Sequence, residues 1–128
     1  MNILKIMLLP SALFLVLVGF GLWPGKTGKP YNNLLFNMHK LIALAAAILT
    51  GIRIFDLDPF STFPNLAILL IGLAFVGVLG MFATGTLMSI KDEATETALV
   101  LHRIITGVIF LSFMFAIYLI INEQLKTL

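Results

Sequence analysis

The chain has 128 residues, of which 60% are hydrophobic and 11% are charged, and its net charge at pH 7 is +2. A soluble domain is about 45–50% apolar and about 25% charged, so a soluble fold of this size could not bury so much apolar surface. The absence of cysteine excludes disulfides, iron–sulfur clusters and covalently attached haem, and the small, scattered charge argues against nucleic acid as a partner.

Four apolar stretches are each close to the ~20 residues that a helix needs to cross a bilayer. They are long and continuous, which favours membrane-spanning helices over the short alternating strands of a barrel. In chain order the stretches are Leu4–Leu22, Leu34–Phe55, Pro64–Leu87 and Thr97–Ile121.

The first stretch is predicted to be an uncleaved span and not a signal peptide. Its run from Ile6 to Trp23 is about 18 residues long, against ~7–15 for the apolar region of a signal peptide, and no A-x-A-like cleavage site follows it. The segment after it, Pro24 to Pro30, combines proline, glycine and lysine and predicts a polar loop.

The later connections also carry helix-ending and helix-starting residues. Asp58 precedes a proline, which disfavours helix at Asp58, and Pro64 suits the first turn of the next helix. Acidic residues gather before the last stretch, where they suit the positive end of a helix dipole, so that helix is expected to begin earlier. The prediction is an all-α membrane protein, a four-transmembrane-helix up-down-up-down bundle in a single transmembrane domain, 1–128, with helices at about 4–22, 34–55, 64–87 and 94–121.

Cations are distributed unevenly between the two predicted membrane sides. By the positive-inside rule, the richer side faces the cytoplasm of a prokaryotic-type plasma membrane, and both termini are expected outside. The poorer side has Lys5, Arg53 and Lys126, and the richer side has Lys26, Lys29, Lys40, Lys91 and Arg103.

Two histidines are the main functional candidates, because ionisable residues inside spans are costly unless they have a role. His39 and His102 fall on the second and fourth predicted helices, which run parallel in this topology. Their distances from the helix starts are similar, so both imidazoles are expected at similar depth. Their surroundings also match, since Met38–Ala43 and Leu101–Thr106 each read apolar, histidine, cation, aliphatic, aliphatic, small.

Two imidazoles at one depth are what a six-coordinate b-type haem requires, with the apolar interior of a bundle around the ring. Small residues that follow each histidine, including Ala43 and Thr106, leave room for a flat macrocycle or for another helix. Lys40 and Arg103 follow the histidines directly and are expected to pair with the propionates.

The His39-Lys40 and His102-Arg103 pairs resemble those of small four-helix membrane b-type cytochromes, cytochrome b561-like in style. Two-haem members of that group carry two histidines on each ligating helix, whereas this chain has one per helix and Arg53 about 14 residues after His39. The resemblance therefore implies at most one haem b, with the iron held by His39 and His102, and single-electron transfer to a redox partner or quinone.

Several other interpretations stay open at this stage. The histidines could ligate a metal ion, although zinc usually takes three or four ligands, or they could be structural residues at the membrane interface or between helices. The chain would then be a cofactor-free scaffold or an accessory subunit of a larger complex, or a homo-oligomer, with lipid as its surroundings. A small oligomeric transporter is a further alternative. No nucleophile–base arrangement or phosphate loop is visible, so an electron carrier or subunit is favoured over a stand-alone enzyme.

Overall fold

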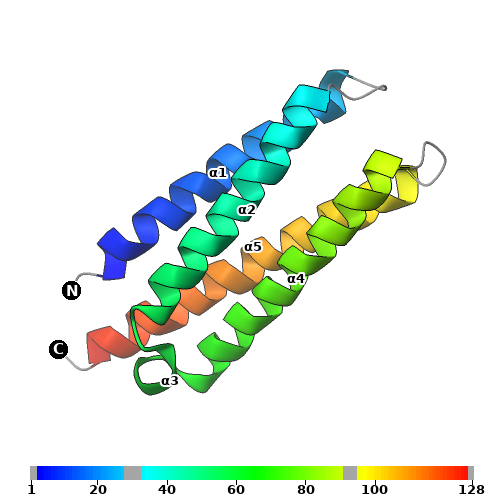
Figure 1. Ribbon diagram of the computed structural model, residues 1–128. Coiled ribbons are helices and arrows are strands. Elements are labelled where there is room, and N and C mark those ends of the chain that lie inside the picture. The colour runs from blue at the N-terminus through cyan, green and yellow to red at the C-terminus, as the bar shows by residue number, and fades with distance from the viewer. Residues whose placement is uncertain (1–2, 28–32, 91–94, 127–128) are drawn as a thin grey trace. The chain divides into compact units, whose positions relative to one another are not determined.

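The computed structural model describes residues 3–27, 33–90 and 95–126, with side chains over 8–22, 34–89 and 96–126. Within these ranges the chain is helical and contains no strand, which confirms the predicted all-α class. The helices are α1 (Ile3–Thr27), α2 (Asn33–Phe55), α3 (Pro59–Thr62), α4 (Asn65–Ile90) and α5 (Thr95–Lys126) (Figure 1).

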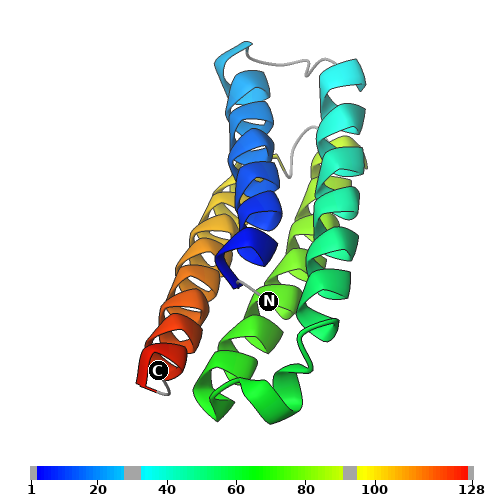
Figure 2. The ribbon, with the colours of Figure 1, turned by 90° about the vertical axis from the view of Figure 1, so that its left-hand side faces the viewer.

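The chain divides into two compact units, Met1–Leu57 and Asp58–Leu128. In the first unit α1 packs against α2, and in the second α4 packs against α5. Each pair is antiparallel, as the direction of the colours along the ribbons shows (Figure 2). We call α1–α2 the first hairpin and α4–α5 the second hairpin.

Three helices are long and apolar enough to cross a membrane, over Leu34–Phe55, Asn65–Ser89 and Glu96–Lys126. The apolar part of α1 in the described side chains is shorter, Leu8–Leu22. Large apolar side chains lie on the outside of the hairpins, with Leu79 70% exposed and Leu111 68% exposed. Hydrocarbon solvates such side chains without penalty and water does not. The chain is therefore a helical membrane protein.

The second hairpin is packed along a seam in which the buried residues 67, 71 and 74 of α4, and 109, 112, 116 and 120 of α5, are three or four positions apart. This spacing keeps one stripe of each helix against its neighbour, as in coiled coils and membrane bundles. At Gly77 the approach is close, because a Cβ built there would lie 2.6 Å from Cγ1 of Ile109. The buried residues of the seam are Ala67, Ile71, Ala74 and Thr84 on α4, and Ala98, Ile109, Ser112, Ala116 and Ile120 on α5.

Two helices extend beyond their predicted ends. α1 continues past Leu22 to Thr27, although Pro24 lacks an amide proton and removes one helical hydrogen bond. Because that loss falls in the last turn, the helix tolerates it. α5 continues past Ile121 to Lys126, whose ammonium lies 3.0 Å from the Glu123 carboxylate. The rest of the predicted first loop, 28–30, and the cation Lys91 lie outside the described residues.

A four-residue helix, α3, occupies the connection that was predicted from Asp58 and Pro64. Asp58 adopts a left-handed conformation with φ of 47°, which aspartate tolerates better than most residues. The Ser61 hydroxyl donates to the Asp58 carboxylate at 2.6 Å, and Pro59 begins the helix. The predicted break at Asp58 is thus observed, and the chain turns there before α4 begins.

Candidate functional site

His39 lies in the first hairpin, partly buried against α1. Its Cε1 atom is 3.1 Å from the place that a Cβ would occupy at Gly21, so the ring packs directly on the α1 backbone. The imidazole also hydrogen-bonds the backbone of Leu17, one turn earlier on α1. Inside a helix the amide proton is already used, so the carbonyl of Leu17 is the acceptor and the imidazole the donor.

His102 lies in the second hairpin and hydrogen-bonds across it. Its Nδ1 is 2.9 Å from Oγ1 of Thr84 on α4. The Thr84 hydroxyl also lies 3.0 Å from the carbonyl oxygen of Gly80 and 3.1 Å from that of Met81. Thr84 is 7% exposed, so water has little access to this cluster. The imidazole is therefore fixed to α4 through one buried hydroxyl.

The two histidines occupy equivalent places in the two hairpins. His102 follows Thr84 by 18 residues, and His39 follows Gly21 by the same number. The backbone acceptor also corresponds, since Leu17 and Gly80 each precede these contact residues by one helical turn. The hydrogen bonds differ in two ways. His39 reaches its carbonyl directly, whereas His102 reaches the carbonyl of Gly80 through the Thr84 hydroxyl, and His102 uses Nδ1, whereas the buried Nδ1 of His39 is not the bonding nitrogen.

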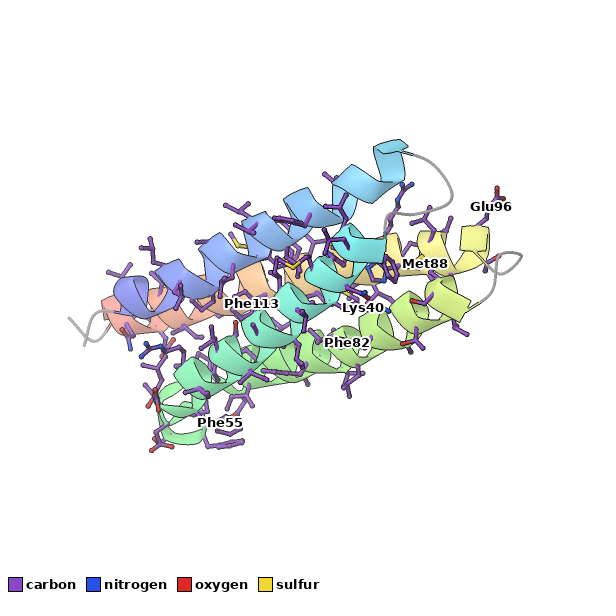
Figure 3. All side chains as sticks on the ribbon, turned by 45° about the horizontal axis from the view of Figure 1, so that its top comes forward. Lys40, Phe55, Phe82, Met88, Glu96 and Phe113 are labelled. Carbon is purple, nitrogen blue, oxygen red and sulfur yellow. The ribbon has the colours of Figure 1, made fainter. Side chains whose placement is uncertain are left out.

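Lys40 and Arg103, the cations that follow the two histidines, have different surroundings. Lys40 projects from α2 (Figure 3). Its ammonium lies 4.5 Å from the centre of the Phe36 ring, one turn earlier on the same helix, in a cation–π contact. Arg103 is exposed on α5. Lys40 is thus partly desolvated along its own helix and Arg103 reaches outward, so both remain candidates for an anionic group near the histidines.

The small residues after the histidines also differ between the hairpins. Ala43 is partly buried on α2. Thr106 donates to the carbonyl of His102 at 2.7 Å and lies 3.7 Å from Sδ of Met81 on α4. The face of α5 that begins at His102 therefore packs against a neighbouring helix over this turn, which was one of the two uses predicted for it.

Two residues with direct contacts to the histidines were not predicted as site residues. The sequence pattern indicates no functional role for Gly21, and it indicates that Thr84 is one of several small residues that pack between helices. The signal that identifies both is the equal 18-residue separation from the following histidine, which becomes visible only when one contact is known.

No group of three or more His, Cys, Asp or Glu side chains in the described ranges could hold a metal ion. Comparisons with protein families, with curated proteins and with solved structures found no match. The two histidines and their neighbours are therefore the chemical features from which a function can be inferred.

Proposed function

We propose that this chain is a membrane b-type cytochrome that binds one haem through His39 and His102 and transfers single electrons. The observation that carries the proposal is the equivalent seating of the two histidines, each on the second helix of a hairpin and each tied to the first helix. An orientation fixed by a second residue is typical of histidines that ligate metals. Two histidines with unrelated structural roles would not be expected to make such similar contacts with the first helix of each hairpin.

The residues fit the group chemically. Haem would supply a one-electron iron couple when bound. His39 and His102 would hold its iron, and the hydrogen bonds to α1 and α4 would orient their rings. Lys40 and Arg103 would pair with the two propionates, and Ala43 would keep the adjoining surface of α2 free of a large side chain. Thr106, which contacts Met81 of α4, would border the haem on the α5 side.

The proposed membrane topology has four spans in an up-down-up-down order. α1 has 25 residues, which corresponds to ~38 Å of helix and is long enough for a bilayer core of ~30 Å. With α1 as a span, both termini lie outside a prokaryotic-type plasma membrane, and the histidines lie toward the cytoplasmic side. The electron partner is a quinone or a protein of the same membrane, and the chain acts as a carrier or as a subunit of a larger complex.

The decisive experiment is an optical spectrum of the full chain, purified in detergent after expression with ample haem. We expect a sharp Soret band and b-type α and β bands after reduction with dithionite. The double variant His39→Ala plus His102→Ala should lose the bound haem and keep its membrane insertion and helix content. Asn37→Ala, an exposed change two residues from His39, is the matched control and should retain haem. Full haem retention in the double histidine variant would overturn the proposal.

A second candidate is a cofactor-free scaffold or accessory subunit. It is favoured by the fact that both histidines already have contacts inside their own hairpins, which is what interhelical structural histidines do. A featureless spectrum from folded protein with haem supplied would favour this candidate. Native mass spectrometry that finds only monomers would then count against an assembly role.

A further inference from the structure

We propose that Thr84 is a positioning residue that holds His102 with its proton on Nδ1, so that Nε2 carries the lone pair for a ligand. The assignment of the proton follows from the contacts of α4 and α5 alone. The use of Nε2 as an iron ligand rests on the proposed function.

The proton count at Thr84 decides the tautomer. A threonine hydroxyl has one proton and two lone pairs. Its oxygen lies 3.0 Å and 3.1 Å from the carbonyl oxygens of Gly80 and Met81, and these oxygens can only accept. The single proton of Thr84 therefore goes to the carbonyls, and Nδ1 of His102, at 2.9 Å, must be the donor of the third hydrogen bond.

The opposite arrangement is unfavourable. If Thr84 donated to Nδ1, its oxygen would face two carbonyl oxygens with no proton between them. Thr84 is 7% exposed, so water could not relieve this contact. These carbonyls already accept backbone N–H groups within α4, so the cost of this arrangement is the repulsion between oxygen lone pairs that face each other. With Nδ1 as donor, the proton of the hydroxyl points toward a carbonyl, the imidazole N–H has an acceptor, and this repulsion is absent.

Other hydroxyls on α4 show what is particular to Thr84. Thr86 donates to the carbonyl of Phe82 at 2.8 Å, and Ser89 donates to that of Gly85 at 3.2 Å. Such bonds to the preceding turn are the ordinary behaviour of helical serine and threonine. At Thr84 the same bond is made, and the remaining lone pair reaches His102 on α5. Thr86, exposed on the same helix, is therefore a matched control.

The fixed tautomer has a consequence for ligand strength. A histidine that donates its second ring N–H to an acceptor is held in orientation and becomes a more basic ligand. A more basic ligand stabilises ferric over ferrous haem. Loss of the Thr84 hydroxyl should therefore raise the reduction potential and weaken haem binding about 10-fold or more.

The tautomer can be tested without haem. We would record ¹⁵N NMR spectra of the full chain with labelled histidine, purified in detergent without added haem, in a His39→Asn background so that only His102 reports. We expect a protonated Nδ1 and an unprotonated Nε2 with Thr84, with Thr84→Ser and with Thr86→Val. Thr84→Val, which has the same shape without the hydroxyl, should lose this pattern. A protonated Nε2 beside the intact Thr84, in a His39→Asn chain that keeps the helix content of the parent, would overturn the proposal.

The ligand role is tested separately, in the haem-loaded chain with both histidines. Thr84→Val should shift the potential upward and lower the haem affinity, while Thr84→Ser and Thr86→Val should match the parent. An unchanged potential and affinity in Thr84→Val would overturn the role of Nε2. If the chain binds no haem but Nδ1 is protonated as expected, the proposed function fails and the tautomer assignment stands.

Discussion

Gly21 is the residue on which the seating of His39 depends most directly. A Cβ at this position would lie 3.1 Å from Cε1 and 3.7 Å from Nδ1 of the imidazole. The distance to Cε1 is shorter than an ordinary van der Waals contact, so the ring would have to move by a few tenths of an ångström. Glycine is needed here for the close approach of α2, not for its backbone conformation.

We expect Gly21→Ala to weaken haem binding, because the displaced ring no longer presents its nitrogen in the same orientation. Overpacking of about 1 kcal/mol corresponds to about a fivefold loss of affinity. The measurement is a haem titration followed at the Soret band. Gly19→Ala is the control, since a Cβ there meets nothing within 4 Å. Equal affinities in the two variants would show that the packing of His39 on Gly21 does not matter for the ligand.

At the scale of the helix pair, the second hairpin depends on one point of closest approach. Gly77 faces Ile109, and buried residues lie three or four positions apart on α4 before it and on α5 after Ile109. Helix association in lipid relies on close packing, because lipid leaves little hydrophobic drive between helices. A single methyl group at this point is therefore expected to have a large effect.

Gly77→Ala should destabilise the second hairpin by about 1–3 kcal/mol, because its Cβ would meet Cγ1 of Ile109 at 2.6 Å. Gly72→Ala, on the same helix with nothing within 4 Å, should be neutral or stabilising by up to about 1 kcal/mol. The check is the midpoint of denaturant unfolding in detergent, followed by helix content. A Gly77→Ala midpoint equal to that of Gly72→Ala would contradict the packing.

The helices that hydropathy could locate were the ones with clear polar boundaries. α2 and α4 begin and end within a few residues of the predictions, because charged and proline-rich segments flank them. α1 and α5 were predicted too short, because the chain remains helical beyond the apolar residues. α3 is too short for any periodic pattern. The contacts of Gly21 and Thr84 with the histidines are tertiary, and no feature of the local sequence of α1 or α4 predicts them.

At the scale of the whole molecule, the membrane topology is open to a direct test, because the chain has no cysteine. Single cysteines would be introduced as Asn2→Cys, Lys29→Cys, Lys91→Cys and Lys126→Cys and labelled with a membrane-impermeant reagent in intact cells. We expect positions 2 and 126 to react and positions 29 and 91 to react only after lysis, since the proposed four spans would put both loops in the cytoplasm. Labelling of positions 2 and 29 from the same side would show that α1 does not cross the membrane.

The two hairpins differ in how a mutation can reach their histidines. The acceptor for His39 is a main-chain atom of Leu17, which exists whatever amino acid is encoded there. The acceptor for His102 is a side chain, so a single codon change at Thr84 removes it. Genetic drift can therefore remove the hydrogen bond of His102 in the second hairpin while His39 in the first hairpin keeps its own. Natural variants with altered behaviour should arise at codon 84 far more readily than at codon 17.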